Sequence, residues 1–274
     1  MREELRERRI SDTTFCFLDV ETTGLRPHFG DRICEIALLK WRENETLDAF
    51  STLVNPERPI PPGARAVHGI TDEMVREAPK FGEIAEEVIG FIGDSVIVAH
   101  NAPFDMSFLA FQLAELKLPQ LQNPVLCTLR LARSRFSFRS YSLASIAYEL
   151  GVEMRGWHRA MVDVETTKEI FRLFLRRFRE EGIIRLGELL ELQGDIPLPR
   201  PDALILPPAV EEAVRSGRPL QIRYLSFLGR ETVRIIEPLE VVCYRGYIYL
   251  IAFCRMCGGR RTFRFDRILE MRPI

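Results

Sequence analysis

The pattern of hydrophobic and polar positions divides the chain into a strand-rich beginning, a helical middle and a strand-rich end. In the first part, apolar runs separated by turn-forming residues predict three strands, at 14–20, 31–41 and 47–54, which suggest an antiparallel meander. From residue 72 onward the apolar residues recur at helical spacing. This spacing predicts helices at 81–92, 104–116, 142–150 and 161–179, and a short buried strand at 95–99. Strands followed by alternating strands and helices are typical of a mixed α/β domain.

The pattern lapses near residue 190. Residues 192–208 hold five of the chain's 17 prolines, which is typical of a linker. Beyond it, the apolar pattern predicts a short helix and four β-rich runs, at 209–215, 220–227, 232–242, 247–253 and 262–265. We therefore expect a first domain at 1–190, a linker at 191–206 and a small β-rich domain at 207–274.

Length and composition support this division. At 274 residues the chain is near the limit of about 250–300 residues for a single hydrophobic core. Hydrophobic residues make up 46% and charged residues 28%, which excludes wholesale disorder. The net charge is −1, so any nucleic-acid binding must come from local patches. The C-terminal part, 204–274, is such a region, with 12 arginines against 7 acidic residues.

The cellular location follows from what the N-terminal residues lack. The first ten residues are charged and have no apolar core of the kind found in signal peptides. No apolar run approaches the roughly 20 residues of a membrane span. We therefore expect a cytoplasmic protein with no membrane partner, and its 6 cysteines should be reduced thiols.

The strongest chemical signal is the end of the first predicted strand. Asp19 and Glu21 are two residues apart, so on a strand they project from the same face. Two adjacent carboxylates repel, and burying them costs several kcal/mol unless a cation lies between them. Oxygen ligands of this kind suit Mg²⁺ or Mn²⁺. The alternative is a pair of solvated acids at a strand end.

Two further acids occupy similar places. Asp105 lies where the buried strand at 95–99 leads into a helix, although an acid at such a junction is also a common helix N-cap. Asp163 should lie in the first turns of the last long helix, with His158 on the loop before it. Strand ends and helix starts are where metal-dependent active sites are built.

Three short motifs carry a resemblance to a known family. DVETTG (residues 19–24), HNAPFD (residues 100–105) and H-x4-D (residues 158–163) resemble, in order, the three motifs of the DEDDh (DnaQ-like) 3′→5′ exonucleases. The stretches NP (55–56), VHGIT (67–71) and CTLRLAR (127–133) are also similar to that family, and the resemblance covers about 12–180. It implies an RNase H-like fold, a mixed sheet flanked by helices.

The resemblance also implies roles for individual residues. Asp19, Glu21, Asp105 and Asp163 would hold two divalent cations, Mg²⁺ or Mn²⁺, and His158 would be the general base. The residues expected to contact the terminal nucleotide are Thr22, Thr23, Gly24, Leu25 and Phe104. Among these, Leu25 would be an apolar wedge and Phe104 a stacking face, with plain core packing as the alternative for Phe104.

The C-terminal part resembles a WYL domain, a small β-rich module of SH3/Sm-like barrel type. The similar stretches are IRY (222–224), EPL (237–239), YIYLIA (247–252) and RTFRFDRI (261–268), and the name-giving Trp is replaced by Ile248. The resemblance implies a face formed by Tyr249, Arg261 and Arg264 that binds nucleic acid or a nucleotide-like ligand. In the alternative, these arginines are solvated and the module provides only bulk or a dimer contact.

Taken together, these signals predict a 3′→5′ exonuclease that releases 5′-mononucleotides from single-stranded or frayed DNA ends, in repair or proofreading. No polymerase partner is indicated. Two alternatives stay open, namely an exoribonuclease that trims RNA and a non-catalytic nucleic-acid sensor regulated through the WYL-like domain. A third, a redox or zinc protein built on Cys254 and Cys257, is weaker because one C-x-x-C pair supplies only two of the four ligands of a structural zinc.

Overall fold

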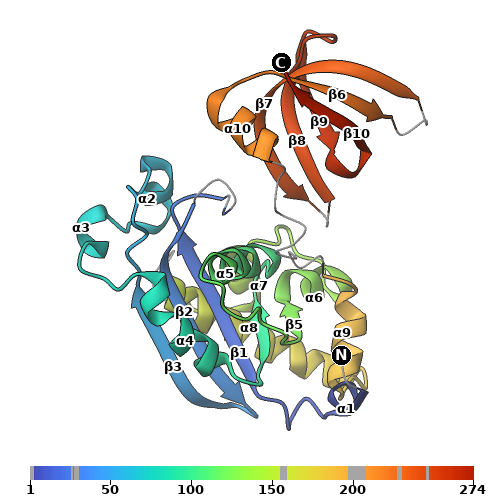
Figure 1. Ribbon diagram of the computed structural model, residues 1–274. Helices are drawn as coiled ribbons and strands as arrows, with labels where there is room; N and C mark the ends of the chain where they lie inside the picture. The colour runs from blue at the N-terminus through green and yellow to red at the C-terminus, as the bar shows by residue number, and fades with distance from the viewer. Residues whose placement is uncertain are drawn as a thin grey trace. The chain divides into compact units, whose positions relative to one another are not determined.

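The chain forms two compact units, Met1–Ile196 and Pro197–Ile274 (Figure 1). The computed structural model describes residues 3–25, 27, 31–154, 159–196, 208–226, 230–244 and 247–274. No described helix is both long enough and apolar enough to cross a membrane.

A mixed five-stranded sheet forms the centre of the first unit, in the order β3-β2-β1-β4-β5. The strands are β1 (Phe15–Thr22), β2 (Ile33–Arg42), β3 (Glu45–Leu53), β4 (Val96–Ala99) and β5 (Val125–Cys127). The first three pair in antiparallel fashion, which confirms the predicted meander. Strands β4 and β5 run parallel to β1, so β1 lies in the middle with both edges paired.

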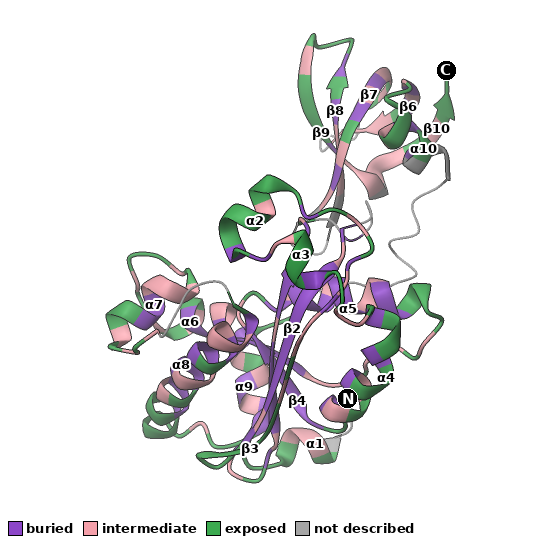
Figure 2. Ribbon diagram, turned by 90° about the vertical axis from the view of Figure 1, so that its left-hand side faces the viewer, coloured by how far each residue is buried: buried purple, intermediate pink, exposed green. Residues whose placement is uncertain are grey.

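Helices cover both faces of this sheet. They are α1 (Glu3–Glu7), α2 (Pro62–His68), α3 (Asp72–Val75), α4 (Phe81–Ile92), α5 (Pro103–Glu115), α6 (Thr128–Arg135), α7 (Leu143–Leu150), α8 (Ala160–Glu180) and α9 (Leu186–Gln193). One core joins Phe15 and Phe17 of β1 to α6, α7, α8 and α9. A second core joins Cys16 and Leu18 to α4 and α5. The central strands are buried along most of their length, whereas the helices turn exposed faces outward (Figure 2).

The packing of β1 determines which face of the sheet its last side chains project from. Side chains alternate between the two faces of a strand, and the row that contains Phe15 and Phe17 packs against α8. Asp19 and Glu21 continue that row, beyond the last phenylalanine. The pairing register of β1 with β2 shifts between Glu21 and Thr22, an irregularity of the kind that often lies beside active sites.

The second unit consists of one helix and one antiparallel sheet. Its elements are α10 (Pro208–Ser216), β6 (Leu220–Leu225), β7 (Glu231–Tyr244), β8 (Tyr247–Cys254), β9 (Gly259–Arg264), the short 3₁₀ helix η3 (Phe265–Arg267) and β10 (Ile268–Pro273). The strand order is β10-β6-β7-β8-β9. Among the described residues no ladder joins β9 to β10, so the sheet is not a closed barrel.

Two local expectations need correction. Helix α9 continues to Gln193, so the first three residues of the expected linker are helical, and residues 197–207 lie outside the described part of the chain. Phe265, predicted to lie on a strand, begins η3 instead. The N–H of Ile268 returns to the carbonyl of Phe265 there, which closes a tight turn and ends the strand.

Candidate active site

The structure brings three of the predicted carboxylates together. Asp19 and Glu21 project from β1, and Asp163 lies in the first turn of α8, where its N–H donates to the carbonyl of Arg159 (3.1 Å). One carboxylate oxygen from each of the three residues lies within 4.8 Å of the others. The predicted convergence of a strand end with a helix start is therefore what the structure shows for these three side chains.

Asp105 reaches the same strand from the opposite side of the sheet. It is almost fully buried in the first turn of α5, and its Oδ1 accepts a hydrogen bond from the N–H of Val20, at 3.2 Å. The residue before α5 is Ala102, so Asp105 is not the N-cap that its sequence position also allowed. The bond fixes the Asp105 carboxylate to the backbone between Asp19 and Glu21.

The electrostatics of this cluster favour a cation. Burial, followed by the neighbouring charges of Asp163 and Glu35, raises the pKa of Glu21 to about 8. Burial and the charge of Asp105 raise the pKa of Asp19 well above its usual value. Burial, reinforced by Asp163, raises the pKa of Asp105 to about 8. A set of crowded carboxylate oxygens that resists ionisation fits a hard divalent cation, which would stabilise the ionised forms.

Glu35, which sequence analysis missed, organises the approach to Asp163. It lies on β2 directly opposite Glu21 and is 3% exposed. Its carboxylate accepts hydrogen bonds from Nε (3.0 Å) and Nη2 (2.7 Å) of Arg159 and from the N–H of Ala160 (3.0 Å). Because Arg159 and Ala160 begin α8, this contact fixes the helix that carries Asp163 against the sheet. The available signal was an acid near the start of a largely apolar predicted strand, ICEIALLKW.

The predicted base, His158, lies outside the described residues, as does all of 155–158, so its role stays a prediction. The two described family-motif histidines contact the backbone. Nδ1 of His68 accepts from the N–H of Ile70 (3.0 Å), and its Nε2 lies 3.3 Å from the carbonyl oxygen of Thr22. Burial lowers the pKa of His100 to about 4, and its Nε2 lies 3.0 Å from the carbonyl oxygen of Tyr141. Both histidines therefore hold loops by hydrogen bonds.

The predicted nucleotide contacts follow β1 directly. Thr22 Oγ1 donates to the carbonyl of Gly24 (2.6 Å), and Thr23 Oγ1 accepts from the N–H of Arg32 (3.0 Å). A Cβ at Gly24 would overlap the Asp31 carboxylate, so any larger residue there would displace that side chain. Leu25 is 78% exposed, which leaves it available as an apolar wedge.

Phe104 differs from these residues. Its ring lies 5.1 Å from that of Phe108, and it packs partly buried against the core that contains α4 and α5. The structure therefore gives Phe104 a packing contact, and a stacking role for its remaining exposed surface is still a prediction.

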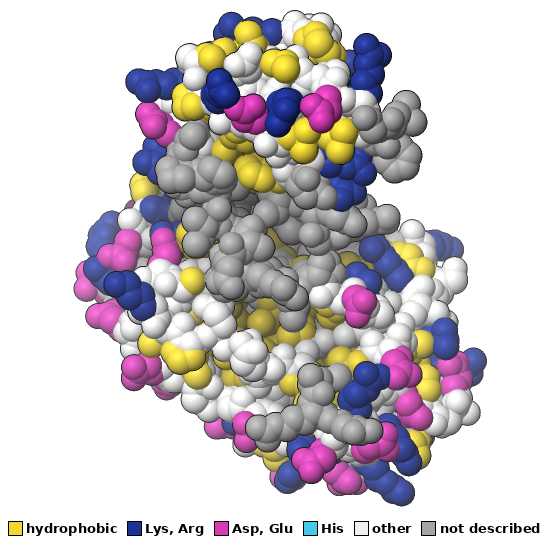
Figure 3. All heavy atoms as spheres, turned by 45° about the vertical axis from the view of Figure 1, so that its right-hand side comes forward, with side chains coloured by type: hydrophobic (Ala, Val, Ile, Leu, Met, Phe, Trp, Pro, Cys, Tyr) yellow, Lys and Arg dark blue, Asp and Glu magenta, His cyan; other side chains and the backbone are white. Residues whose placement is uncertain are grey.

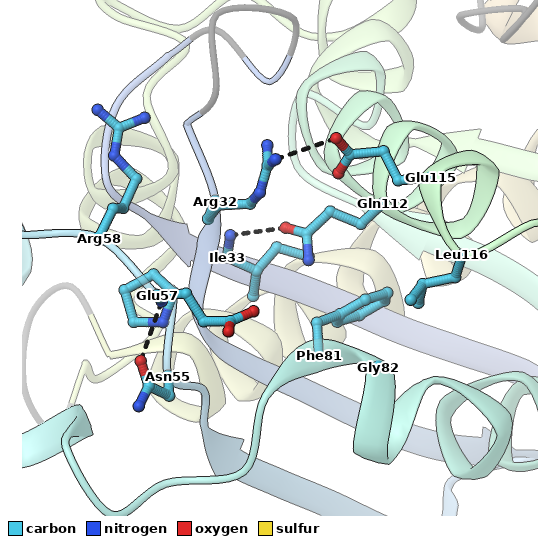
Figure 4. Close-up of a pocket in the computed structure, with 11 residues that line it drawn as sticks. Arg32, Ile33, Asn55, Glu57, Arg58, Phe81, Gly82, Gln112, Glu115 and Leu116 are labelled. Carbon is cyan, nitrogen blue, oxygen red and sulfur yellow. Dashed lines mark hydrogen bonds and ion pairs between the residues drawn. The ribbon is translucent and has the colours of Figure 1, made fainter.

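A pocket of about 290 Å³ lies near the segment that follows β1 (Figure 4). None of the clustered carboxylates, Asp19, Glu21 and Asp163, lines it. Its walls come from the start of β2, the segment 55–58, the start of α4 and the end of α5. Its two arginines are ion-paired, Arg32 with Glu115 (3.0 Å) and Arg58 with Asp31 (3.1 Å). Because both arginines of the pocket already pair with carboxylates, we place the candidate active site at the cluster of Asp19, Glu21 and Asp163 and not in this pocket.

The predicted ligand face of the second unit is divided between two faces of its sheet. Tyr249 and Arg264 are directly paired across β8 and β9 and share one face. Arg261 pairs with Ala252, on the other face, where Phe263 is buried. Several other arginines of this unit pair with acids, among them Arg255 with Glu237 (2.8 Å). On the first unit, the face drawn in Figure 3 likewise shows basic and acidic side chains interspersed.

The fold and the cluster together define a class, a mixed α/β domain whose carboxylates can hold divalent metal at the end of the central strand. Residues 16–171 match the RNase T exonuclease family, and residues 207–273 match the WYL domain. Because the first match covers more than half of the chain, this protein belongs to that exonuclease family and carries a WYL domain after it. The resemblances to DnaQ-like exonucleases and to WYL domains are thus confirmed.

Curated relatives are much longer proteins. The chain is 38% identical over 187 residues to the DNA polymerase III PolC-type protein of Thermotoga maritima, covering 68% of this chain and 14% of that protein. It is 38% identical over 192 residues to a DNA polymerase III subunit epsilon-like protein of Rhodobacter capsulatus, covering 68% of this chain and 27% of that protein. This chain therefore spans less than a third of these relatives.

Solved structures share the fold. Exonuclease X in complex with 5′ overhanging duplex DNA is 28% identical, with a TM-score of 0.50, and the match covers 66% of this chain and 99% of that chain. Escherichia coli Exonuclease I in complex with a dT13 oligonucleotide is 19% identical, with a TM-score of 0.55, and covers 88% of this chain and 55% of the other. At 19% identity, the second likeness shows the fold alone.

Proposed function

We propose that this protein is a metal-dependent 3′→5′ exonuclease that releases 5′-mononucleotides from DNA. The observation that carries the proposal is the group formed by Asp19, Glu21 and Asp163, whose carboxylate oxygens lie within 4.8 Å of one another. Asp105, fixed to the backbone of β1, would complete the ligand set for two divalent cations, Mg²⁺ or Mn²⁺.

Each part of the site would have a distinct task. Divalent cations, when bound, activate a water and stabilise charge on the leaving oxygen. The four carboxylates hold those cations, and the Glu35–Arg159 contact keeps Asp163 aligned with β1. His158 would accept the proton of the attacking water, a task suited to a side chain that titrates near neutral pH. Leu25 would separate the terminal base from its neighbour.

DNA is the favoured substrate. Relatives at 38% identity are named as DNA polymerase III proteins, and the exonuclease X structure holds a DNA duplex with a 5′ overhang. An exposed Leu25 beside the carboxylates suits a single-stranded or frayed 3′ end, because an apolar wedge needs an unstacked base. We therefore place the activity in repair or proofreading of DNA ends.

The test compares matched 5′-labelled substrates, namely single-stranded DNA, duplex DNA and RNA, each with Mg²⁺, Mn²⁺ or EDTA. We expect a metal-dependent ladder that shortens from the 3′ end, fastest on single-stranded DNA. Asp163→Asn should lower the rate by orders of magnitude. The control is Asp94→Asn, an exposed acid that precedes β4 at the opposite end of the sheet from the cluster.

The other outcomes separate the alternatives. Faster shortening of RNA than of DNA would make the protein an exoribonuclease. Tight binding of single strands without any shortening in Mg²⁺ or Mn²⁺ would make it a sensor. Equal rates for Asp163→Asn and Asp94→Asn would remove the carboxylate cluster from the mechanism.

A further inference from the structure

The second unit contains a chemical group that nuclease activity does not use. Cys254 ends β8, and Cys257 follows in the four-residue connection to β9. Cys254 is fully buried, whereas Cys257 is exposed. Cys16, Cys34 and Cys127 are buried in the first unit. Among the five cysteines whose side chains the structure describes, Cys257 is therefore the one that small reagents can reach directly.

The backbone places the two sulfurs within reach of one another. The N–H of Cys257 donates to the carbonyl of Cys254 at 3.2 Å, which closes a β-turn between the two residues. The Cα atoms at the ends of such a turn lie within about 7 Å. Disulfides span Cα separations of roughly 4.4–6.8 Å. Gly258, with a φ of 63°, then allows the chain to pair Gly259 with Cys254 and continue into β9.

An arginine connects the two thiols. Arg234 Nη1 lies 3.4 Å from Sγ of Cys257 and 3.9 Å from Sγ of Cys254. Its Nε donates to Thr232 Oγ1 (3.0 Å), and its guanidinium lies 5.8 Å from the ring centroid of Phe263. The position follows from the register: Ile236 pairs with Cys254, and Arg234, two residues earlier on β7, shares its face. A fixed guanidinium next to sulfur stabilises the thiolate.

The thiol environment agrees with this geometry. Burial acts to raise the pKa of Cys254, but hydrogen bonds from the backbone N–H of Cys257, from Arg234 and from the Cys257 side chain lower it below its usual value. At Cys16, by contrast, burial outweighs the Lys40 charge and the backbone hydrogen bond from Leu39, and it raises the pKa of that thiol to about 12.

We propose that Cys254 and Cys257 form a reversible dithiol–disulfide pair that reacts with small-molecule disulfides. The exposed Cys257 thiolate attacks the small disulfide, forms a mixed disulfide and releases one small thiolate. The Cys254 thiolate then attacks the Cys257 sulfur and releases the second. Two protein thiols are oxidised, one small disulfide is reduced to two thiols, and the two protons pass to those leaving groups.

The same contacts argue against a metal. A cation bound to both sulfurs would lie beside the positive Arg234 guanidinium, which already occupies the space next to them. Among the described residues, moreover, the only cluster of three or more potential ligands is that of Asp19, Glu21 and Asp163. A zinc held at this turn would thus lack half of its usual four ligands.

The test incubates the protein, residues 1–274, with mixtures of reduced and oxidised glutathione under native conditions, followed by acid quench, alkylation and peptide mass mapping. The wild-type protein should lose both thiols together and yield a peptide linked between Cys254 and Cys257, and dithiothreitol should reverse it. Cys254→Ser should stop at one glutathione on Cys257. Cys257→Ser, an exposed substitution that leaves the core intact, should take up no glutathione at Cys254.

A rate measurement tests the role of Arg234. Arg234→Gln removes the charge that stabilises the Cys254 thiolate, so the pKa of Cys254 should rise and less thiolate should be present. The remaining thiolate is a stronger nucleophile, which offsets part of this loss, so disulfide closure should slow about threefold for each unit by which the pKa rises. Arg260→Gln, an exposed change on the same hairpin, should leave the rate unchanged. The proposal is overturned if wild-type protein retains glutathione on Cys257 while Cys254 stays free for alkylation. It is also overturned if the purified protein holds zinc through both cysteines.

Discussion

The carboxylate cluster should make the metal-free protein less stable as the pH rises. Glu21 belongs to this cluster and is 9% exposed, and burial together with Asp163 and Glu35 raises its pKa to about 8 from an ordinary value of 4.5. A raised pKa means that the folded state binds the proton more tightly than the unfolded chain does. The stability that protonated Glu21 contributes is therefore fully present below the pKa of the unfolded chain. It is lost as the pH rises through the pKa of the folded state.

The size of this effect follows from the two pKa values. Ionising Glu21 costs the folded state about 1 kcal/mol at pH 5 and about 4 kcal/mol at pH 8, relative to the unfolded chain. The substitution Glu21→Gln removes the charge and keeps the shape. The difference in unfolding free energy between Glu21→Gln and wild type should therefore increase in favour of the variant by about 3 kcal/mol from pH 5 to pH 8 in EDTA. This increase corresponds to a difference on the order of 10 °C in Tm.

Tryptophan fluorescence is the suitable assay. The chain's 2 tryptophans, Trp41 and Trp157, both belong to the first unit, so their signal follows that unit alone. Unfolding is measured at pH 5 and pH 8, in EDTA and in Mg²⁺. The control is Glu87→Gln, an exposed residue of α4, whose stability relative to wild type should not change with pH.

Metal should reverse the comparison. Bound Mg²⁺ stabilises the ionised carboxylates, so in Mg²⁺ at pH 8 the wild type should gain stability that Glu21→Gln does not. If the difference between Glu21→Gln and wild type were the same at pH 5 and pH 8 in EDTA, Glu21 would not have the raised pKa that burial and its acidic neighbours predict.

Three further predictions concern the neighbouring parts. Glu35→Gln removes the charge that pairs with Arg159, so it should lower the rate by about 10- to 100-fold and raise the metal concentration required. Combining it with Arg159→Gln should lower the rate little further, as a double-mutant cycle of initial rates would show. His158→Ala should remove most of the activity and flatten the rise in rate through the histidine range while metal binding, followed by calorimetry, is retained; a wild-type rate would assign the base elsewhere. A chain ending at Ile196 should bind single-stranded DNA more weakly and with a shallower salt dependence in fluorescence anisotropy, and an equal salt slope would exclude a contribution from the WYL domain.

The sequence predicted the elements with strong periodicity and missed those formed by tertiary contacts. Helix α4 lies where its apolar spacing placed it, because five of its residues are buried along one face. Helix α9 was not predicted, and a distant contact fixes its last residue: the Gln193 side chain accepts from Cys127 N–H and donates to the Val125 carbonyl, both at 2.8 Å. Strand β10 was missed because none of its residues is buried, so no buried apolar run marks it, and it exists through its pairing with β6.

The site shows the same division. Asp19 and Glu21 were recognisable because they are neighbours on one strand, and Asp163 because a helix begins just before it. Glu35 was not recognisable, since its partner Arg159 lies 124 residues away in the sequence and no local pattern joins them. Neither did the sequence decide whether Asp105 is a helix N-cap; the structure excludes the cap, because Ala102 precedes α5, and its role as a ligand stays a prediction.

One measurement tests the central claim most directly. The same single-stranded DNA oligonucleotide, labelled at either its 5′ or its 3′ end, is incubated with the two-domain protein and Mg²⁺ or Mn²⁺, with EDTA and Asp19→Asn as parallel arms. We predict that the 3′ label leaves at once as a 5′-mononucleotide while the 5′-labelled strand shortens one nucleotide at a time, and that neither occurs in EDTA or with Asp19→Asn. First release of the 5′ label, internal cleavage, or undiminished hydrolysis by Asp19→Asn would contradict a 3′→5′ exonuclease built on these carboxylates.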